Sequence, residues 1–544
     1  MSLSSLIRMK PRLRIYTVPH HPLTPRQLFY RGIGLRGMCN SAIASECPHE
    51  VSQGIASSHV KPYDEVPGPR PIPILGNAWR LLPLIGQYQI SDVGKISQMF
   101  YDEYGKIVRL GGLMGRPDLL FVYDADEIEK VYRQEGPTPF RPAMPCLVHY
   151  KSVVRKDFFG ELPGVVGVHG EPWKEFRTRV QKPVLQPQTI RKYITPIEIV
   201  TMDFIKRIEK IKKDDDELPG DFDNEIHKWA LECIGRVALD VRLGCLGDTL
   251  SPDSEPQKII DVAKFALRNV AALELKAPYW RYIPTPLWSR YVRNMNYFIE
   301  ICMKYIDSAI VRLNNKTVVN ESDLSLVERI LDKETDPKMA YIFALDLILV
   351  GIDTASFISM AVCSILYQLA TRPEEQEKIY QELLQILPDP SVPLTTSHLD
   401  RAVYMKAFIR EVFRVYSTVI GNGRTLQNDT IICGYRIPKG VQVVFPTLVT
   451  GNMEEYVTNA KTFKPARWLI KDAYNEKLHP FASLPYGHGA RMCLGRRFAD
   501  LEMQVLLAKL LRSYKLEYHH KPLKYKVTFM YAPDGELKFK VLKR

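Results

Sequence analysis

The feature that most constrains the fold is a long, mostly apolar stretch between residues 336 and 371. Asp336 can cap a helix at this point, Pro337 suits its first turn, and Arg372-Pro373 ends the pattern. At about 1.5 Å per residue this helix would be roughly 50 Å long, enough to cross a domain. Because it is apolar nearly all round, we expect it to be buried at the centre of a large helical protein.

A transmembrane helix is the competing interpretation, since residues 354–371 carry no charge. Asp346 and Asp353 lie near the middle of the apolar stretch, however, where insertion into a bilayer would cost about 2.5–3.5 kcal/mol each. We therefore favour a buried helix. At its centre, Gly351 removes side-chain bulk where another group can approach the backbone. The adjacent Asp353-Thr354 is either a satisfied core pair or a functional one.

The remaining pattern is mainly α with small β-sheets. Apolar residues at helical spacing predict helices over residues 190–213, 259–269, 290–314 and 374–387. Short strand-like runs cover residues 107–110, 119–122, 430–437, 442–445, 516–518 and 525–530. At about 150 residues per domain, a chain of 544 residues suggests several domains. Because no linker or internal repeat interrupts the chain, we expect residues 60–544 to form a single large helical domain.

The N-terminus carries much of the positive charge. Residues 1–45 contain no Asp or Glu, but several early serines and the basic residues Arg8, Lys10, Arg12, Arg14, Arg26, Arg31 and Arg36. This composition is typical of a mitochondrial transit peptide, predicted over residues 1–50, with a disordered basic tail as the alternative. Seven basic and two acidic residues give this leader +5 of the formal +13, which leaves +8 for the rest. The proline-rich residues 66–76 indicate a stiff lead-in to the folded domain.

The strongest chemical signal is the segment Tyr486-Gly-His-Gly-Ala-Arg-Met-Cys-Leu-Gly495. Gly487 and Gly489 permit a tight loop that can lie against a planar cofactor. Cys493 precedes a helical pattern over residues 495–511, so the helix start and the nearby Arg491 favour a thiolate. A lone thiolate does not suit zinc or iron–sulfur binding, but it suits the single axial ligand of a haem iron. An inert buried cysteine is the alternative.

Further motifs, in a fixed order along the chain, identify a resemblance. The cysteine loop matches the pattern FGxGxRxCxG of the cytochrome P450 family, with Tyr486 in place of Phe. The family motifs ExxR, FxPxR and WxxxR are matched by residues 411–414, 463–467 and 173–177. The chain thus resembles cytochromes P450, which are haem–thiolate monooxygenases, over residues 60 to 544. The resemblance implies the P450 fold, a single helical haem domain with a long central helix.

The resemblance also implies roles for individual residues. Cys493 would be the axial ligand of the iron of haem b (iron protoporphyrin IX), and the haem propionates would be bound by Trp173, Arg177, Arg424 and Arg491. A buried salt-bridged triad supporting the cysteine loop would consist of Glu411, Arg414 and Arg467. On the central helix, Asp353 and Thr354 would relay protons during the activation of O2. Val350 replaces the usual Ala or Gly and implies a narrower space for substrate, while the hydroxyl of Tyr486 could alter the redox potential.

The electron donor is suggested by charge. Lys406 and Arg410 are four residues apart and share a helix face, while Arg496 and Arg497 follow the cysteine loop. This resembles the mitochondrial class of the family, which accepts electrons from an acidic [2Fe–2S] ferredoxin and its NADPH-dependent reductase. The class implies a position on the matrix side of the inner mitochondrial membrane, with peripheral membrane contact and no nucleic-acid partner. Simple solvated cations are the alternative.

Residues 421–429 and 434–440 further resemble arthropod mitochondrial members of the family. The substrate implied is a lipophilic small molecule, either an insecticide or other xenobiotic, or an insect hormone in an ecdysteroid-biosynthetic hydroxylase. Two alternatives from other classes are a haem–thiolate isomerase and a non-catalytic haem sensor. The Asp353-Thr354 pair speaks against the isomerase, and the cations at residues 406, 410, 496 and 497 speak against the sensor.

Overall fold

The structure is a computed structural model that describes residues 60–544, apart from residues 83–84, 90–91, 114, 142–144, 161–167, 249, 276–277, 316–323, 335, 470–476 and 528–529. Within the helices, the side chains of Val350, Asp353 and a few further residues also lie outside the described part. The predicted leader, residues 1–50, falls outside it entirely. Residues Val60–Arg544 form one compact unit.

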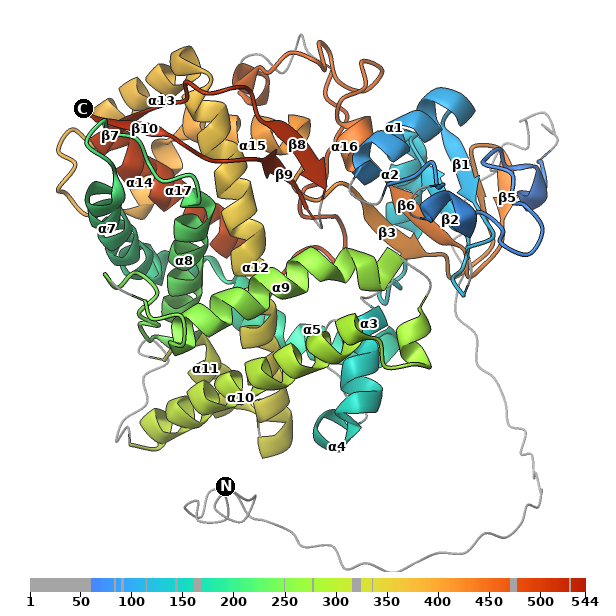
Figure 1. Ribbon diagram of the computed structural model, residues 1–544, viewed down its shortest axis with the longest axis horizontal. Coiled ribbons are helices and arrows are strands. Elements are labelled where there is room, and N and C mark those ends of the chain that lie inside the picture. Colours follow the sequence, from blue (N-terminus) through green and yellow to red (C-terminus); the bar gives the residue numbers. More distant parts are fainter. Residues whose placement is uncertain are drawn as a thin grey trace, which may run out of the picture. The chain divides into compact units, whose positions relative to one another are not determined.

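Helix α12 (Pro337–Ala370) is the predicted central helix, with bounds close to those expected. The Asp336 side chain accepts a hydrogen bond from the backbone N–H of Lys338 at 2.9 Å, which confirms the predicted cap. In Figure 1, α12 runs through the helical part of the molecule with α8 (Phe222–Ile234) beside it. It also contacts α9 (Glu255–Leu275), α10 (Pro286–Asn315) and α11 (Leu326–Lys333). The buried faces of these helices belong to one large apolar core.

The other predicted helices are present with small changes. The helix predicted over residues 190–213 is interrupted at Tyr193, where α6 (Pro187–Lys192) ends before α7 (Ile194–Ile211) begins. The helix predicted over 374–387 is α13 (Pro373–Ile386). Three helices carry site residues: α5 (Gly170–Leu185), α15 (Val403–Val415) and α17 (Arg496–Ser513). The shorter helices are α1 (Val93–Tyr104), α2 (Ala125–Gln134), α3 (Pro145–His149), α4 (Lys156–Phe159), α14 (Thr396–Arg401) and α16 (Thr447–Thr450).

The strands form small sheets, as expected. The largest has the order β1–β2–β6–β3, from β1 (Ile107–Leu110), β2 (Leu119–Val122), β6 (Gln442–Phe445) and β3 (Asn422–Thr425). In this sheet β2 and β6 are parallel, and the other neighbours are antiparallel. Figure 1 shows α1 and α2 beside it. The three two-stranded sheets are β4 (Thr430–Ile432) with β5 (Tyr435–Ile437), β7 (Tyr514–Glu517) with β10 (Lys540–Lys543), and β8 (Lys524–Val527) with β9 (Tyr531–Asp534).

Two predictions about strands were wrong or incomplete. The run over residues 430–437 is a hairpin rather than one strand, because Cys433 and Gly434 both adopt positive φ, at 49° and 79°. Strands β3, β9 and β10 were not predicted, since the run over residues 525–530 corresponds only to β8. Among the described residues, no single helix is long and apolar enough to cross a membrane. The two helical segments over residues 354–370 and 373–386, which are bent relative to each other, are together long and apolar enough by length and composition only.

Candidate active site

The cysteine loop connects β6 and the following segments to the start of α17. Gly487 and Gly489 have φ values of 72° and 76°, which confirms the predicted left-handed turns. The backbone N–H of Cys493 donates to the carbonyl oxygen of Tyr486 at 2.9 Å, so the loop closes on itself. The positive φ of Gly489 would strain any other residue, and a Cβ there would also displace the carboxylate of Glu135, so the position favours glycine. These turns and this hydrogen bond shape the loop, which places Cys493 three residues before α17.

The electrostatics of Cys493 differ in part from the prediction. Burial raises the pKa of its thiol, against the opposing effect of the Gly495 backbone N–H and of the charges on Arg141 and Arg177. The expected helix-start contribution is thus present, but burial outweighs it in the polypeptide alone. Among the nearby positive charges, those of Arg141 and Arg177 lower the pKa of Cys493 more than that of Arg491 does.

The Arg491 guanidinium is fixed by several contacts. It donates to the carbonyl oxygens of Pro139 and Val168 at 2.8 and 2.9 Å, and lies 3.2 Å from Nδ1 of His169. It also lies over the ring of Trp173, 4.0 Å from the ring centroid. The structure therefore brings together two of the predicted cofactor-binding residues, Trp173 from α5 and Arg491 from the cysteine loop.

Two further predicted arginines also contact the cysteine loop. Arg177 on α5 donates to the carbonyl oxygen of Met492 at 2.7 Å. Arg424 on β3 donates to the carbonyl oxygen of His488 at 3.0 Å and forms an ion pair with Glu135. The Nε atom of Arg177 is buried without a hydrogen-bond partner among the described residues. All four predicted residues thus surround one loop.

The arginines form a concentrated positive site. Burial, together with the charges of Arg141, Arg424 and Arg177, lowers the pKa of Arg491 to about 9, while Glu135 opposes this shift. Arg424 and Arg491 are buried, and such crowding of cations is unfavourable unless anions bind beside them. Two carboxylates of a planar cofactor, with a thiolate beside them, would fit this donor set. Arg141 was missed by sequence reasoning because it belongs to no motif.

The predicted supporting triad is formed. Arg414 donates to both oxygens of Glu411, at 3.0 and 2.7 Å, and Nε of Arg467 donates to Glu411 at 3.0 Å. All three side chains are buried. Although burial opposes ionisation, the bonds from Arg414 and the Lys464 N–H hold the pKa of Glu411 below its usual value. Both arginines also bond backbone carbonyls between residues 451 and 462, so the triad fixes the chain leading to the cysteine loop.

The middle of α12 contains the predicted Gly351 and Thr354. A Cβ on Gly351 would lie 3.2 Å from Cγ2 of Ile234, so the group that approaches the helix there is the end of α8. The Thr354 hydroxyl donates to the carbonyl oxygen of Gly351 at 2.6 Å. The side chains of Asp353 and Val350 lie outside the described residues, so their predicted roles remain predictions.

The predicted partner-binding cations lie on two contacting helices, α15 and α17. Arg410 is exposed and lies 5.9 Å from the ring centroid of Trp468, while Lys406 is bonded to the carbonyl oxygen of Asp400 at 2.8 Å. Arg496 donates to Sδ of Met492 at 3.1 Å. Arg497 donates to the carbonyl oxygen of Leu185 on α5, which holds it against the protein rather than free at the surface.

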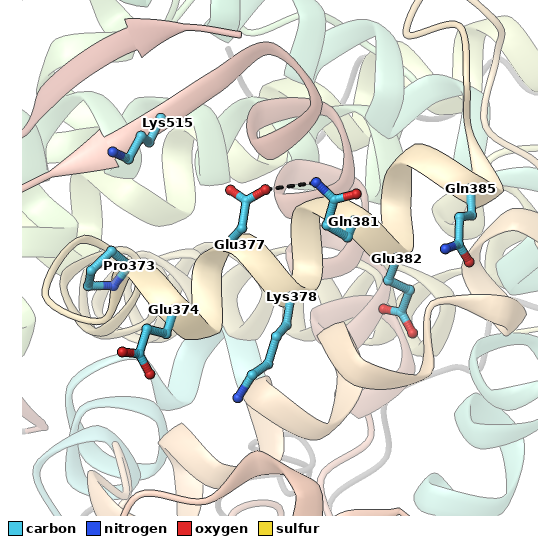
Figure 2. Close-up of a pocket in the computed structure, with 8 residues that line it drawn as sticks. All are labelled: Pro373, Glu374, Glu377, Lys378, Gln381, Glu382, Gln385 and Lys515. Atoms are coloured by element: carbon cyan, nitrogen blue, oxygen red, sulfur yellow. Dashed lines mark hydrogen bonds between the residues drawn. The ribbon is translucent and has the colours of Figure 1, made fainter.

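A separate groove runs along the exposed face of α13. Figure 2 shows the side chains from Pro373 to Gln385 that line it, with Glu377 accepting a hydrogen bond from Gln381 at 2.8 Å. Lys515 of β7 faces them from the other side. None of the predicted site residues lines this groove. It is therefore not the candidate active site.

Comparison with known proteins agrees with this geometry. The cytochrome P450 family model matches residues 66–539. The chain is 66% identical over 521 residues to "Probable cytochrome P450 301a1, mitochondrial" of Drosophila melanogaster, covering 93% of this chain and 94% of the relative. Two further relatives are from the same fly. The chain is 44% identical to "Probable cytochrome P450 49a1", with 92% of this chain and 86% of the relative covered. It is 32% identical to "Probable cytochrome P450 12a5, mitochondrial", with 88% of this chain and 91% of the relative covered.

These relatives and the family match support a mitochondrial type of enzyme and a haem cofactor. They also agree with the helical fold built around α12 and with the order of the motifs along the chain. This chain belongs to the cytochrome P450 family of haem–thiolate monooxygenases.

Proposed function

We propose that this chain is a mitochondrial P450 monooxygenase in which Cys493 is the axial ligand of haem b. The observation that supports this most directly is the position of Cys493. It lies in a loop shaped by two left-handed glycines, beside four arginines whose charges act on one another. That arrangement offers one thiol and a cationic site for carboxylates, which is the donor set that haem b requires.

Each side chain then has a role in binding. Trp173, Arg177, Arg424 and Arg491, with Arg141 added by the structure, hold the haem carboxylates, while Glu135 keeps Arg424 oriented through their ion pair. The triad Glu411, Arg414 and Arg467 stabilises the segment before the loop. When bound, the haem supplies the O2 activation through which one oxygen atom is inserted into a substrate.

Proton delivery is assigned to α12. The Thr354 hydroxyl is held by the Gly351 carbonyl and can exchange this bond for one to a water or substrate oxygen. Asp353, the residue before Thr354, is the proposed proton donor for this hydroxyl, because a carboxyl group can take up and release a proton. Burial of most of the helix excludes bulk water from the rest of its length.

The proposed electron donor is a mitochondrial [2Fe–2S] ferredoxin, reduced by its NADPH-dependent reductase. Arg410 and Arg496 support this, because both act electrostatically on Asp500 and so lie near one another at the cysteine side. Lys406 adds charge one turn away on α15. An acidic partner would be attracted and oriented by this group of cations.

Peripheral contact with the inner membrane is proposed for exposed apolar side chains of two segments. Ile72, Ile74, Ile85, Tyr282 and Ile283 are all exposed, Ile74 at 97% and Tyr282 at 85%. The loop between β1 and β2 contacts the chain near both segments. Arg116 in this loop donates to the carbonyl oxygen of Leu273 at 3.1 Å. The carbonyl oxygen of Gly112 accepts from the N–H of Asn77 at 2.9 Å. Exposed apolar groups of this kind favour a membrane surface.

The acid-free leader, residues 1–50, is proposed as the transit peptide that directs the chain to the matrix side of that membrane. Of the three relatives named above, two carry the word mitochondrial in their names. The proposed substrate is a lipophilic molecule, an insecticide or other xenobiotic, with ecdysteroid hydroxylation as the second candidate. A screen for haem spin-state shifts with lipophilic toxins and ecdysteroid precursors discriminates the two.

The haem assignment is tested by the spectrum of the reduced, CO-treated protein. The wild type should show the strongly red-shifted Soret band of a thiolate ligand, and Cys493→Ala should abolish it. Cys433→Ala is the matched control, because Cys433 lies in the β4–β5 turn and should leave the band unchanged. A native spectrum in Cys493→Ala would contradict the proposal.

A further inference from the structure

The cysteine loop is tied to α17 by a polar contact that an aromatic ring alone would not make. The hydroxyl of Tyr486, which replaces the family's usual Phe, donates to Oδ1 of Asp500 at 2.6 Å. The carbonyl oxygen of the same tyrosine accepts the N–H of Cys493 at 2.9 Å. One residue therefore joins the cysteine backbone to the Asp500 carboxylate.

The surrounding charges make this pair electrostatically relevant. Burial raises the pKa of Asp500, and the Tyr486 bond and the charges of Arg410 and Arg496 oppose that rise. Burial also holds the pKa of Tyr486 well above its usual value, so its hydroxyl keeps the proton that it donates. In turn, the negative charge of Asp500 acts on Cys493 against the formation of a thiolate. The carboxylate and the sulfur are thus close enough to influence each other's charge.

We propose that Asp500, held in place by Tyr486, is a positioning residue that puts a negative charge near the Cys493 sulfur and lowers the reduction potential of the haem. A fixed negative charge near the iron favours its more positive, ferric state over the ferrous state. The Tyr486 hydroxyl weakens this effect in part, because its donated proton offsets the charge on the carboxylate. The inference rests on the proposed function, since it takes Cys493 as the haem ligand.

Reduction potentials of the haem-loaded full chain, measured by spectroelectrochemical titration at pH 8, test the inference. Asp500→Asn has nearly the same shape and can still accept the Tyr486 bond, but it lacks the charge, so its potential should be higher than that of the wild type. Tyr486→Phe removes the hydroxyl that donates to the Asp500 carboxylate, so the full negative charge of Asp500 remains and the reduction potential should be lower than that of the wild type. In the Asp500→Asn background, Tyr486→Phe should cause little further change, because its effect acts through the charge of Asp500.

Tyr305→Phe is the matched control, because it removes a tyrosine–carboxylate bond of 2.8 Å, to Glu255, between α10 and α9. Its potential should equal that of the wild type. An unchanged potential in either Asp500→Asn or Tyr486→Phe, while the red-shifted band is retained, overturns the inference and leaves the proposed function intact. Absence of that band in the wild type overturns the proposed function itself.

Discussion

At the scale of single residues, Glu502 on α17 is an unusual core group. It is completely buried, and neither carboxyl oxygen has a hydrogen-bond partner among the described residues. Burial raises its pKa well above the ordinary value of 4.5. The folded state therefore binds a proton that the unfolded state releases. The contribution to stability is fully present below about pH 4.5 and is lost as the pH rises toward the pKa in the folded state.

Glu502→Gln removes this pH-dependent loss, because the amide has a similar shape and cannot ionise. We expect the variant to be more stable than the wild type at pH 8.5, by about 1.4 kcal/mol for each unit by which the pKa is raised. The two proteins should be nearly equal at pH 5. Unfolding midpoints at both pH values check the prediction. A difference in midpoint that is the same at pH 5 and pH 8.5 would show that Glu502 does not titrate in this way.

A second buried glutamate serves as control. Glu198 is paired with Lys509 at 2.7 Å, so Glu198→Gln should destabilise the protein at both pH values by leaving the lysine without its carboxylate. A gain in stability at pH 8.5 in Glu502→Gln but not in Glu198→Gln would show that the lack of a partner for Glu502 causes the pH-dependent loss.

The residues of the site were predicted unevenly. Cys493 and the triad belong to motifs with fixed spacing. Residues at a fixed spacing within one helix or loop keep the same relative positions in the folded protein, so they can be predicted from the sequence. Arg141 and Glu135 have no such spacing, because they reach the loop from segments that only the tertiary fold brings near it. Asp500 follows the loop directly on α17, but it belongs to no motif. Arg497 follows the loop in sequence and donates to the carbonyl oxygen of Leu185 in the structure, so its partner-binding role stays a prediction.

At the scale of elements, a buried ion pair fastens a short π-helical turn, η5 (Tyr150–Val154), to α12. Lys151 and Asp346 form this pair, and both side chains are buried. Removing one partner of a buried pair leaves an unpaired charge in the core and costs about 3–5 kcal/mol. We expect Lys151→Met to destabilise the protein by that order and to increase hydrogen exchange over residues 145–159.

The double variant Lys151→Met/Asp346→Leu is the control, because it removes both charges and keeps similar volume. It should recover most of the lost stability. If it is as unstable as the sum of the two single variants, the pair does not fasten the turn, and the cost belongs to the packing of each side chain alone.

The elements most accurately predicted were long helices with a strong apolar period, of which α12 is the clearest. The failures have local causes. The β4–β5 turn has positive φ at a cysteine, a residue that gives no signal for a turn of this type. Strand β3 reads Asn-Gly-Arg-Thr and has no strand pattern, and it forms because β6 supplies the hydrogen-bond partners. Strand β10 likewise depends on β7.

At the scale of the whole molecule, length alone suggested several domains, whereas residues Val60–Arg544 form one compact unit. The largest apolar cluster reaches from α3 to β10, and α12 and its neighbours contribute to it. The charge of +8 outside the leader therefore belongs to one body, so a local excess on α15 and α17 can orient a partner relative to the cysteine loop.

The last prediction concerns that orientation. Lys406→Gln/Arg410→Gln removes two charges from α15, so the KM for an acidic [2Fe–2S] ferredoxin should rise about tenfold at low salt, with a smaller effect on kcat. The dependence of turnover on ionic strength should become shallower, because fewer charges remain to be screened. Steady-state turnover with ferredoxin and its reductase, at several salt concentrations, provides the measurement.

Lys521→Gln/Lys524→Gln is the matched control, because it removes the same net charge from exposed lysines before and within β8. If the control raises KM equally, net charge rather than the α15 cations determines the encounter. Turnover that proceeds equally well without ferredoxin would contradict the electron donor itself, since a haem sensor or an isomerase needs none. A KM that rises only in the α15 variant places the donor at the cysteine side, where electrons have the shortest path to the haem.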